Sequence, residues 1–200
     1  MAMPRVNLRL TLVVLALFAF GAPGVAAEPA IDVKVQQTAE GIYVVTGSFD
    51  VGSTSEAVWQ VLTDYEAIGR FVSSISRSTI KKRESGRILL EQEGVGRAWV
   101  FSRRLHILLD VQEHEQQAIS FRDVCGESFK TYEGRWQLSA KPGGTRVAYE
   151  LRAVPSGRQP GFIARTVIRK NVEGLLGDVR REVMGRFGQR NTMSKAGGLQ

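Results

Sequence analysis

The sequence predicts an α+β fold in which an antiparallel sheet packs against one long C-terminal helix. Between residues 43 and 154, apolar residues alternate with polar ones in short runs separated by turn residues, which is typical of half-buried strands. Between residues 160 and 186 the apolar residues recur at steps of three and four, which is typical of an amphipathic helix. Because consecutive strands with short connections pair antiparallel, we expect one antiparallel sheet of about seven strands.

The first predicted strand is followed by two short helices. Residues 43–51 alternate and include aromatic and β-branched side chains, which favours a strand. Gly52-Ser53-Thr54-Ser55 then offers side chains that cap helix N-termini, and apolar residues follow at helical spacing over 57–62. Asp64 is placed to cap a second short helix over residues 67–71.

The remaining strands are joined by turns, and the chain closes with the long helix. Gly94-Val95-Gly96 is expected in a hairpin, and Lys141-Pro142-Gly143-Gly144 has turn chemistry. The helix begins at Pro160-Gly161 and presents one apolar stripe, with a basic surface that includes Arg180. The strands are predicted at residues 75–82, 88–93, 98–111, 118–124, 131–139 and 145–154.

The N-terminus has the features of a secretory signal peptide. Arg5 and Arg9 precede an uncharged, mostly apolar run over residues 10–20, and small residues follow. The run is too short to span a bilayer, which needs about 20 residues. We therefore expect residues 1–27 to be cleaved after Ala27, with export to the periplasm or the extracellular space. An uncleaved membrane anchor is the alternative.

The mature chain is predicted to be a single domain, residues 28–186, with a disordered polar tail over residues 187–200. A chain of this length buries a substantial core. The formal net charge of +7 suits acidic membrane surfaces and does not demand nucleic acid. Cys125 is the only cysteine, so no internal disulfide forms. We expect a buried, inert thiol; a reactive thiol or an intermolecular bridge is the alternative.

Three segments carry a resemblance to a known family: 58–65 (VWQVLTDY), 129–136 (FKTYEGRW) and 143–150 (GGTRVAYE). Together with the closing helix after Pro160, they resemble the polyketide cyclase/dehydrase family of the START-like (SRPBCC) superfamily, to which coenzyme Q-binding proteins also belong. The resemblance covers roughly residues 42–185. It implies the helix-grip fold, in which a curved sheet grips the closing helix around a cavity for a hydrophobic ligand. The motifs specify the scaffold, so function follows from them only by analogy.

Arg103 is the most unusual residue of the predicted sheet, because it stands in the apolar row of the longest strand. An unpaired charge is costly to bury. Asp123 in the next strand is in phase with apolar residues. We expect Arg103 and Asp123 to face the cavity and pair, or Arg103 to bind a ligand carboxylate or carbonyl. A bulge that turns Arg103 outward is the alternative.

Aromatic side chains are candidates for the cavity wall, since they suit a flat or polyene ligand; ordinary core packing is the alternative for most of them. Tyr149 is the polar candidate after Arg103, because a buried hydroxyl needs a partner. One of Glu91 and Gln92 is expected to point inward. The candidate ligand-binding residues are Arg103, Asp123, Tyr149, Trp99, Phe101, Phe121 and Trp136.

The sequence indicates neither a metal site nor a cofactor site. His106 falls on the polar face of its strand and His114 in a charged turn. Neither has a second histidine at ligand spacing, and there is no cysteine pair, so we expect no metal. Gly94-Val95-Gly96 lacks the third glycine of a dinucleotide-binding loop, and no cofactor is expected.

These observations favour an exported, non-enzymatic carrier for a lipid, quinone or polyketide-like molecule. One alternative is a polyketide cyclase or dehydratase that uses Asp123, Tyr149 and Arg103 as its acid/base set. Another is an envelope protein-interaction module. The basic face of the closing helix is a candidate contact for anionic lipid headgroups, with a solvated helix face as the alternative. Nucleic acid is not an expected partner.

Overall fold

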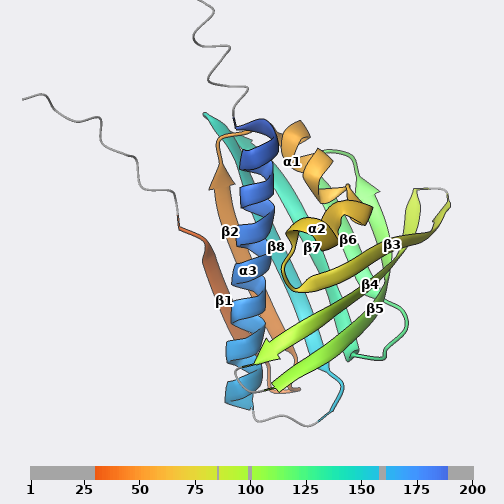
Figure 1. Ribbon diagram of the computed structural model, residues 1–200. Helices are drawn as coiled ribbons and strands as arrows, with labels where there is room; N and C mark the ends of the chain where they lie inside the picture. Colours follow the sequence, from red (N-terminus) through yellow and green to blue (C-terminus); the bar gives the residue numbers. More distant parts are fainter. Residues whose placement is uncertain (1–29, 85, 99–100, 158–160, 189–200) are drawn as a thin grey trace, which may run out of the picture.

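The computed structural model describes residues 30–84, 86–98, 101–157 and 161–188. The predicted signal peptide and the tail beyond residue 188 lie outside the described residues. Among these, one sheet and one long helix dominate the fold (Figure 1). The elements are β1 (Asp32–Gln37), β2 (Tyr43–Val51), α1 (Ser55–Leu62), the 3-10 helix η1 (Tyr65–Ala67), α2 (Ile68–Phe71), β3 (Ile75–Glu84), β4 (Arg87–Ala98), β5 (Phe101–His114), β6 (Ala118–Asp123), β7 (Phe129–Lys141), β8 (Gly144–Pro155) and α3 (Gly161–Phe187).

The sheet is antiparallel throughout, with the strand order β1-β2-β8-β7-β6-β5-β4-β3. Figure 1 shows α3 lying along one face in front of β2 and β8, while β3, β4 and β5 curve around its side. The helix α1 lies near one end of the sheet, and α2 lies beside β3. The predicted α+β class and helix-grip architecture are therefore confirmed.

The predicted strand count of seven is wrong, because the described sheet has eight strands. The missed strand is β1, in which only Val33 and Val35 are buried and the other positions are exposed. Two apolar residues give too weak an alternation to be recognised. What makes the segment a strand is pairing with β2 and contact with α3, neither of which is local in sequence.

The hairpin predicted at Gly94-Val95-Gly96 is also wrong, because β4 continues through these residues to Ala98. Gly94 serves a close approach instead. A Cβ atom there would lie 2.3 Å from the carbonyl oxygen of Ser74, and Val95 N–H donates to that same oxygen at 3.0 Å. The close approach of the Ser74 backbone therefore explains why residue 94 is a glycine, although the sequence pattern suggested a turn.

The apolar faces of the sheet and of α3 meet in one core. Phe49 on β2 is almost fully buried, and Val147 on β8 and Leu176 of α3 are fully buried. Gly47 allows the close approach, since a Cβ atom there would lie 2.6 Å from Cδ1 of Leu176. Space for the helix therefore depends on a glycine in β2.

The predicted apolar stripe of α3 is confirmed: Val172, Leu176, Val179 and Val183 are buried. Arg180 is buried as well, so its assignment to an exposed basic surface is corrected. The N-terminal half of the helix keeps that surface through the exposed Arg165, Arg169 and Lys170, and Arg181 is exposed further along. No helix among the described residues is both long and apolar enough to cross a bilayer.

Candidate functional site

Two adjoining hollows lie between the sheet and α3. The first has a volume of about 120 Å³ and lies between α3 and strands β4, β5, β7 and β8. The second, of about 90 Å³, extends towards α1 and α2. They share five lining residues, which are Ile75, Gln92, Tyr132, Tyr149 and Leu175. The predicted interior cavity is therefore present and divided into two parts.

The observed volumes limit the size of the molecule that the hollows hold in this structure. One water occupies about 30 Å³ of liquid volume, and pockets for drug-sized ligands measure about 300–1,000 Å³. Each hollow exceeds the space of two waters but is smaller than such a pocket. A lipid-sized molecule enters only if side chains or part of α3 move outward.

Aromatic side chains from three strands form a continuous wall of the hollows. The ring centroids of Trp136 (β7) and Tyr149 (β8) are 4.5 Å apart, and those of Phe121 (β6) and Tyr149 are 6.1 Å apart. Phe121 also lies over Gly134, where a Cβ atom would be 2.6 Å from the tip of the ring. The glycine in the predicted family segment therefore provides room for this aromatic ring.

Two tyrosine hydroxyl groups supply hydrogen-bonding groups to the otherwise largely apolar lining of the hollows. Tyr132 and Tyr149 line both hollows, and their hydroxyls interact with each other. Burial raises the pKa of both phenols above the ordinary value. Both hydroxyls are therefore neutral at physiological pH and are able to hydrogen bond a carbonyl or hydroxyl group of a ligand.

Three predicted site residues, Tyr149, Trp136 and Phe121, line the hollows. Trp99 lies outside the described residues, as do the side chains of Phe101 and Arg103.

Asp123, predicted to face the cavity, lines neither hollow. Its carboxylate accepts hydrogen bonds from the backbone N–H groups of Leu108, Cys125 and Gly126, at 3.0, 3.2 and 3.1 Å. It thereby fixes the chain where β6 ends. The pairing with Arg103 stays a prediction, and Asp123 would have to share its oxygens with these backbone groups to make it.

The structure adds cavity residues that the sequence left open. Gln92 is the inward member of its pair: it is buried, lines both hollows and donates to the Ser78 hydroxyl at 3.2 Å. Glu91 points to the other face. Leu175 on α3 and Tyr132 also line the hollows. The phase of β7 offered a signal for Tyr132, which stands four residues before Trp136 on the same face of the strand.

The C-terminal half of α3 is held to the rest of the fold by polar contacts. The carboxylate of the buried Asp178 accepts from the backbone N–H of Ser73, which follows α2, at 2.8 Å, and also pairs with Arg181. Arg186 pairs with Asp64 at 2.7 Å and lies over the ring of Phe71. Asp64 precedes η1 as predicted, but its side chain makes no capping hydrogen bond.

The fold and the position of the hollows define a START-like, helix-grip domain. The chain belongs to the family described as polyketide cyclase / dehydrase and lipid transport, whose sequence profile matches residues 51–180. A search of curated protein sequences found no significant match.

Several solved structures share this fold at low sequence identity. TTHA0849 from Thermus thermophilus is 19% identical with a TM-score of 0.64, covering 72% of this chain and 99% of its own. The Zhui aromatase/cyclase from Streptomyces sp. R1128 is 14% identical with a TM-score of 0.60, covering 72% and 95%. Human StAR-related lipid transfer protein 5 is 14% identical with a TM-score of 0.61, covering 78% and 82%. At these identities the likeness shows the fold alone.

Proposed function

We propose that the protein is an exported carrier that binds a hydrophobic small molecule between its sheet and α3. The observation that carries the proposal is the pair of adjoining hollows with apolar and aromatic walls and one neutral hydroxyl pair. Burying apolar ligand surface there contributes about 25 cal/mol per Å², reduced by ordering costs. The lipid transport function in the family's description agrees with this chemistry, and the sequence of residues 1–27 supports export.

The lining of the hollows favours binding over catalysis. Cyclisation or dehydration requires a positioned acid/base pair. Among the described residues that line the two hollows there is no histidine, and the only carboxylate belongs to Glu93, which is exposed. Because burial raises their pKa, the two phenols stay protonated near neutral pH and cannot accept a proton as general bases. Ligand sequestration is the function that these groups perform without further chemistry.

We propose that the ligand enters beneath the N-terminal half of α3. Ile168 and Val172 of this half line the first hollow, and Asn171 between them supplies a polar side chain. The contacts of Asp178 and Arg186 hold the other half in place. An outward movement of the first half would therefore enlarge the hollows while the core beneath the second half stays closed.

The same half of α3 is our candidate for membrane contact. Phe162 is 75% exposed, and the exposed Arg165, Arg169 and Lys170 follow it. An apolar anchor beside basic residues suits an anionic headgroup region, where each Lys or Arg contributes about 1 kcal/mol. Contact at this point would bring the proposed entrance to the lipid surface.

Replacing Asp178 with alanine is expected to lower the free energy of unfolding by about 1–3 kcal/mol, because the Ser73 N–H loses a charged hydrogen-bond acceptor. Urea denaturation measures this loss. Asp178→Asn is the matched control and should lose less, since its carbonyl oxygen still accepts from Ser73. Equal losses in the two variants would contradict the proposed role of this contact.

Native mass spectrometry of the protein exported by its host, followed by solvent extraction, tests the proposed function. We expect a complex of one hydrophobic molecule per chain, and a protein mass that lacks residues 1–27. cis-Parinaric acid, a fluorescent polyene fatty acid, then serves as a probe that the extracted ligand displaces. An exported protein that carries no extractable molecule and binds no parinaric acid would refute the carrier. A full-length mass would refute only the cleavage.

A further inference from the structure

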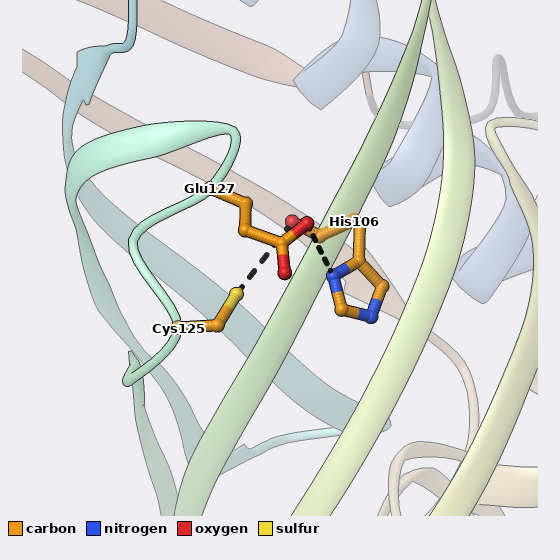
Figure 2. Close-up of side chains that lie close together, drawn as sticks. All are labelled: His106, Cys125 and Glu127. Atoms are coloured by element: carbon orange, nitrogen blue, oxygen red, sulfur yellow. Dashed lines mark hydrogen bonds and ion pairs between the residues drawn. The ribbon is translucent and has the colours of Figure 1, made fainter.

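A histidine, a cysteine and a glutamate come together on the face of the sheet opposite the hollows. Leu105 and Ile107 of β5 line the first hollow, so His106 between them faces outward. Cys125 and Glu127 belong to the loop between β6 and β7, which passes beside it (Figure 2). The possible donor atoms of the three side chains all lie within 4.8 Å of one another.

One nitrogen of His106 is left without a hydrogen bond. Its Nδ1 is buried and has no hydrogen-bond partner, although a carboxylate oxygen of Glu127 lies 3.0 Å away as an ion pair. The ion pair offsets part of the cost of burying this nitrogen without an aligned hydrogen bond. Figure 2 shows this nitrogen directed at the Glu127 carboxylate, whereas the Cys125 thiol is directed at the backbone carbonyl of His106. All three donor atoms nevertheless lie within 4.8 Å of one another.

The other nitrogen of His106 has a partner of the kind found behind metal-bound histidines. Nε2 lies 3.3 Å from Oε1 of Glu91, and the other carboxylate oxygen of Glu91 lies 3.2 Å from Nζ of Lys81. Histidines that bind metals typically donate their second N–H to a carboxylate, which fixes the ring and leaves the first nitrogen free to coordinate. Glu91 is placed to accept the N–H of Nε2, which leaves Nδ1 as the nitrogen that coordinates the metal.

The loop that carries Cys125 and Glu127 is held against β5 by its own hydrogen bonds. The Ser128 hydroxyl accepts from the backbone N–H of His106 at 2.9 Å, and the backbone N–H of Val124 donates to the carbonyl of Leu108 at 2.8 Å. Asp123 binds the backbone N–H groups of Leu108 and Cys125. The thiol and the imidazole are therefore positioned before any ion arrives, which favours binding.

We propose that His106, Cys125 and Glu127 form a Zn²⁺ site. Zn²⁺ takes thiolate sulfur, imidazole nitrogen and carboxylate oxygen in tetrahedral geometry, with donor atoms about 3.3–3.8 Å apart. The carboxylate of Glu127 already lies 3.0 Å from Nδ1 of His106, and all three donor atoms lie within 4.8 Å of one another, so a closer approach of the Cys125 thiol to the other two completes the site. On binding, the Cys125 thiol gives up its hydrogen bond to Asp123 Oδ1 (3.2 Å) and releases its proton to solvent, and water takes the fourth position.

Titration of the purified protein with ZnCl₂ by calorimetry, and with CoCl₂ by absorbance, tests the site. We expect one ion per chain, and a thiolate-to-cobalt charge-transfer band in the near ultraviolet. Cys125→Ser should abolish this band, and His106→Gln should weaken Zn²⁺ binding at least about tenfold. Glu91→Gln, which alters only the positioning carboxylate, should weaken binding about 10–100-fold. His114→Gln is the matched control, since this second histidine lies outside the cluster, and it should bind as the unchanged protein does.

The proposal is overturned if the unchanged protein shows no charge-transfer band at saturating cobalt. It is equally overturned if folded Cys125→Ser, checked by circular dichroism, binds Zn²⁺ as tightly as the unchanged protein. Protection of the single thiol from iodoacetamide by ZnCl₂ gives an independent reading of the same site. Failure here leaves the carrier function intact, because the cluster and the hollows lie on opposite faces of the sheet.

Discussion

Replacing Trp136 with alanine is expected to lower the free energy of unfolding by about 3–5 kcal/mol, the range for truncating a large aromatic side chain in a core. Trp136 is 9% exposed, and its ring packs against Tyr149 with centroids 4.5 Å apart. The loss combines lost apolar burial with the void that remains, since the surrounding strands collapse only in part. Because single domains are stable by about 5–15 kcal/mol, the variant should fold with a clearly lower urea midpoint.

Trp59→Ala provides the comparison for this result. Trp59 lies on α1 and is only partly buried, so it should lose less stability than Trp136. Chemical denaturation of both variants, with the m-value monitored, separates a change in stability from a change in the unfolded state. A loss of less than about 1 kcal/mol for Trp136→Ala would show that this wall of the second hollow rearranges to fill the gap.

Replacing Leu175 with tryptophan is expected to weaken binding of cis-parinaric acid at least about tenfold, equivalent to about 1.4 kcal/mol. Leu175 lines both hollows, so a larger side chain there fills the space that a ligand would enter. Overpacking of this kind costs about 1–3 kcal/mol of stability, which leaves a folded protein to assay. Fluorescence titration measures the effect on binding.

Met184→Trp is the matched control for Leu175→Trp. Met184 lies on the same helix, is 40% exposed and lines neither hollow, so the same side chain placed there should leave binding unchanged. Unaltered parinaric acid binding in folded Leu175→Trp would place the ligand elsewhere and contradict the proposed pocket. Loss of binding in both variants would indicate an effect of the added tryptophan itself, and would also contradict it.

The sequence was sufficient for the class of fold because the strong patterns are local. The alternation in β2 and β8 predicts which residues face the core, and the structure buries Val45, Phe49, Val147 and Tyr149 accordingly. Thr54 was predicted among the helix caps, and its hydroxyl accepts from Ala57 N–H at 3.2 Å. The apolar period of α3 likewise predicts its buried stripe. Each of these patterns can be recognised within a single helix or strand.

Features that depend on two distant segments were missed or stayed undecided. The weak alternation of β1 becomes a strand through its pairing with β2. The role of Gly94 depends on Ser74, which lies across the β3–β4 pair. The choice between Glu91 and Gln92 follows from the register of β4 with its neighbours, which turns Gln92 towards the hollows. Strand phase alone left that choice open.

The sequence by itself determined the alternating strands, the closing amphipathic helix and the motifs that place the chain in its family. Only the tertiary structure decided the small, divided volume of the interior and the meeting of His106 with Cys125 and Glu127 on the outer face. The physical reason is the range of the interactions. Periodicity records which side of an element is apolar, whereas cavity volume and donor geometry depend on how closely side chains from separate strands, loops and α3 approach one another.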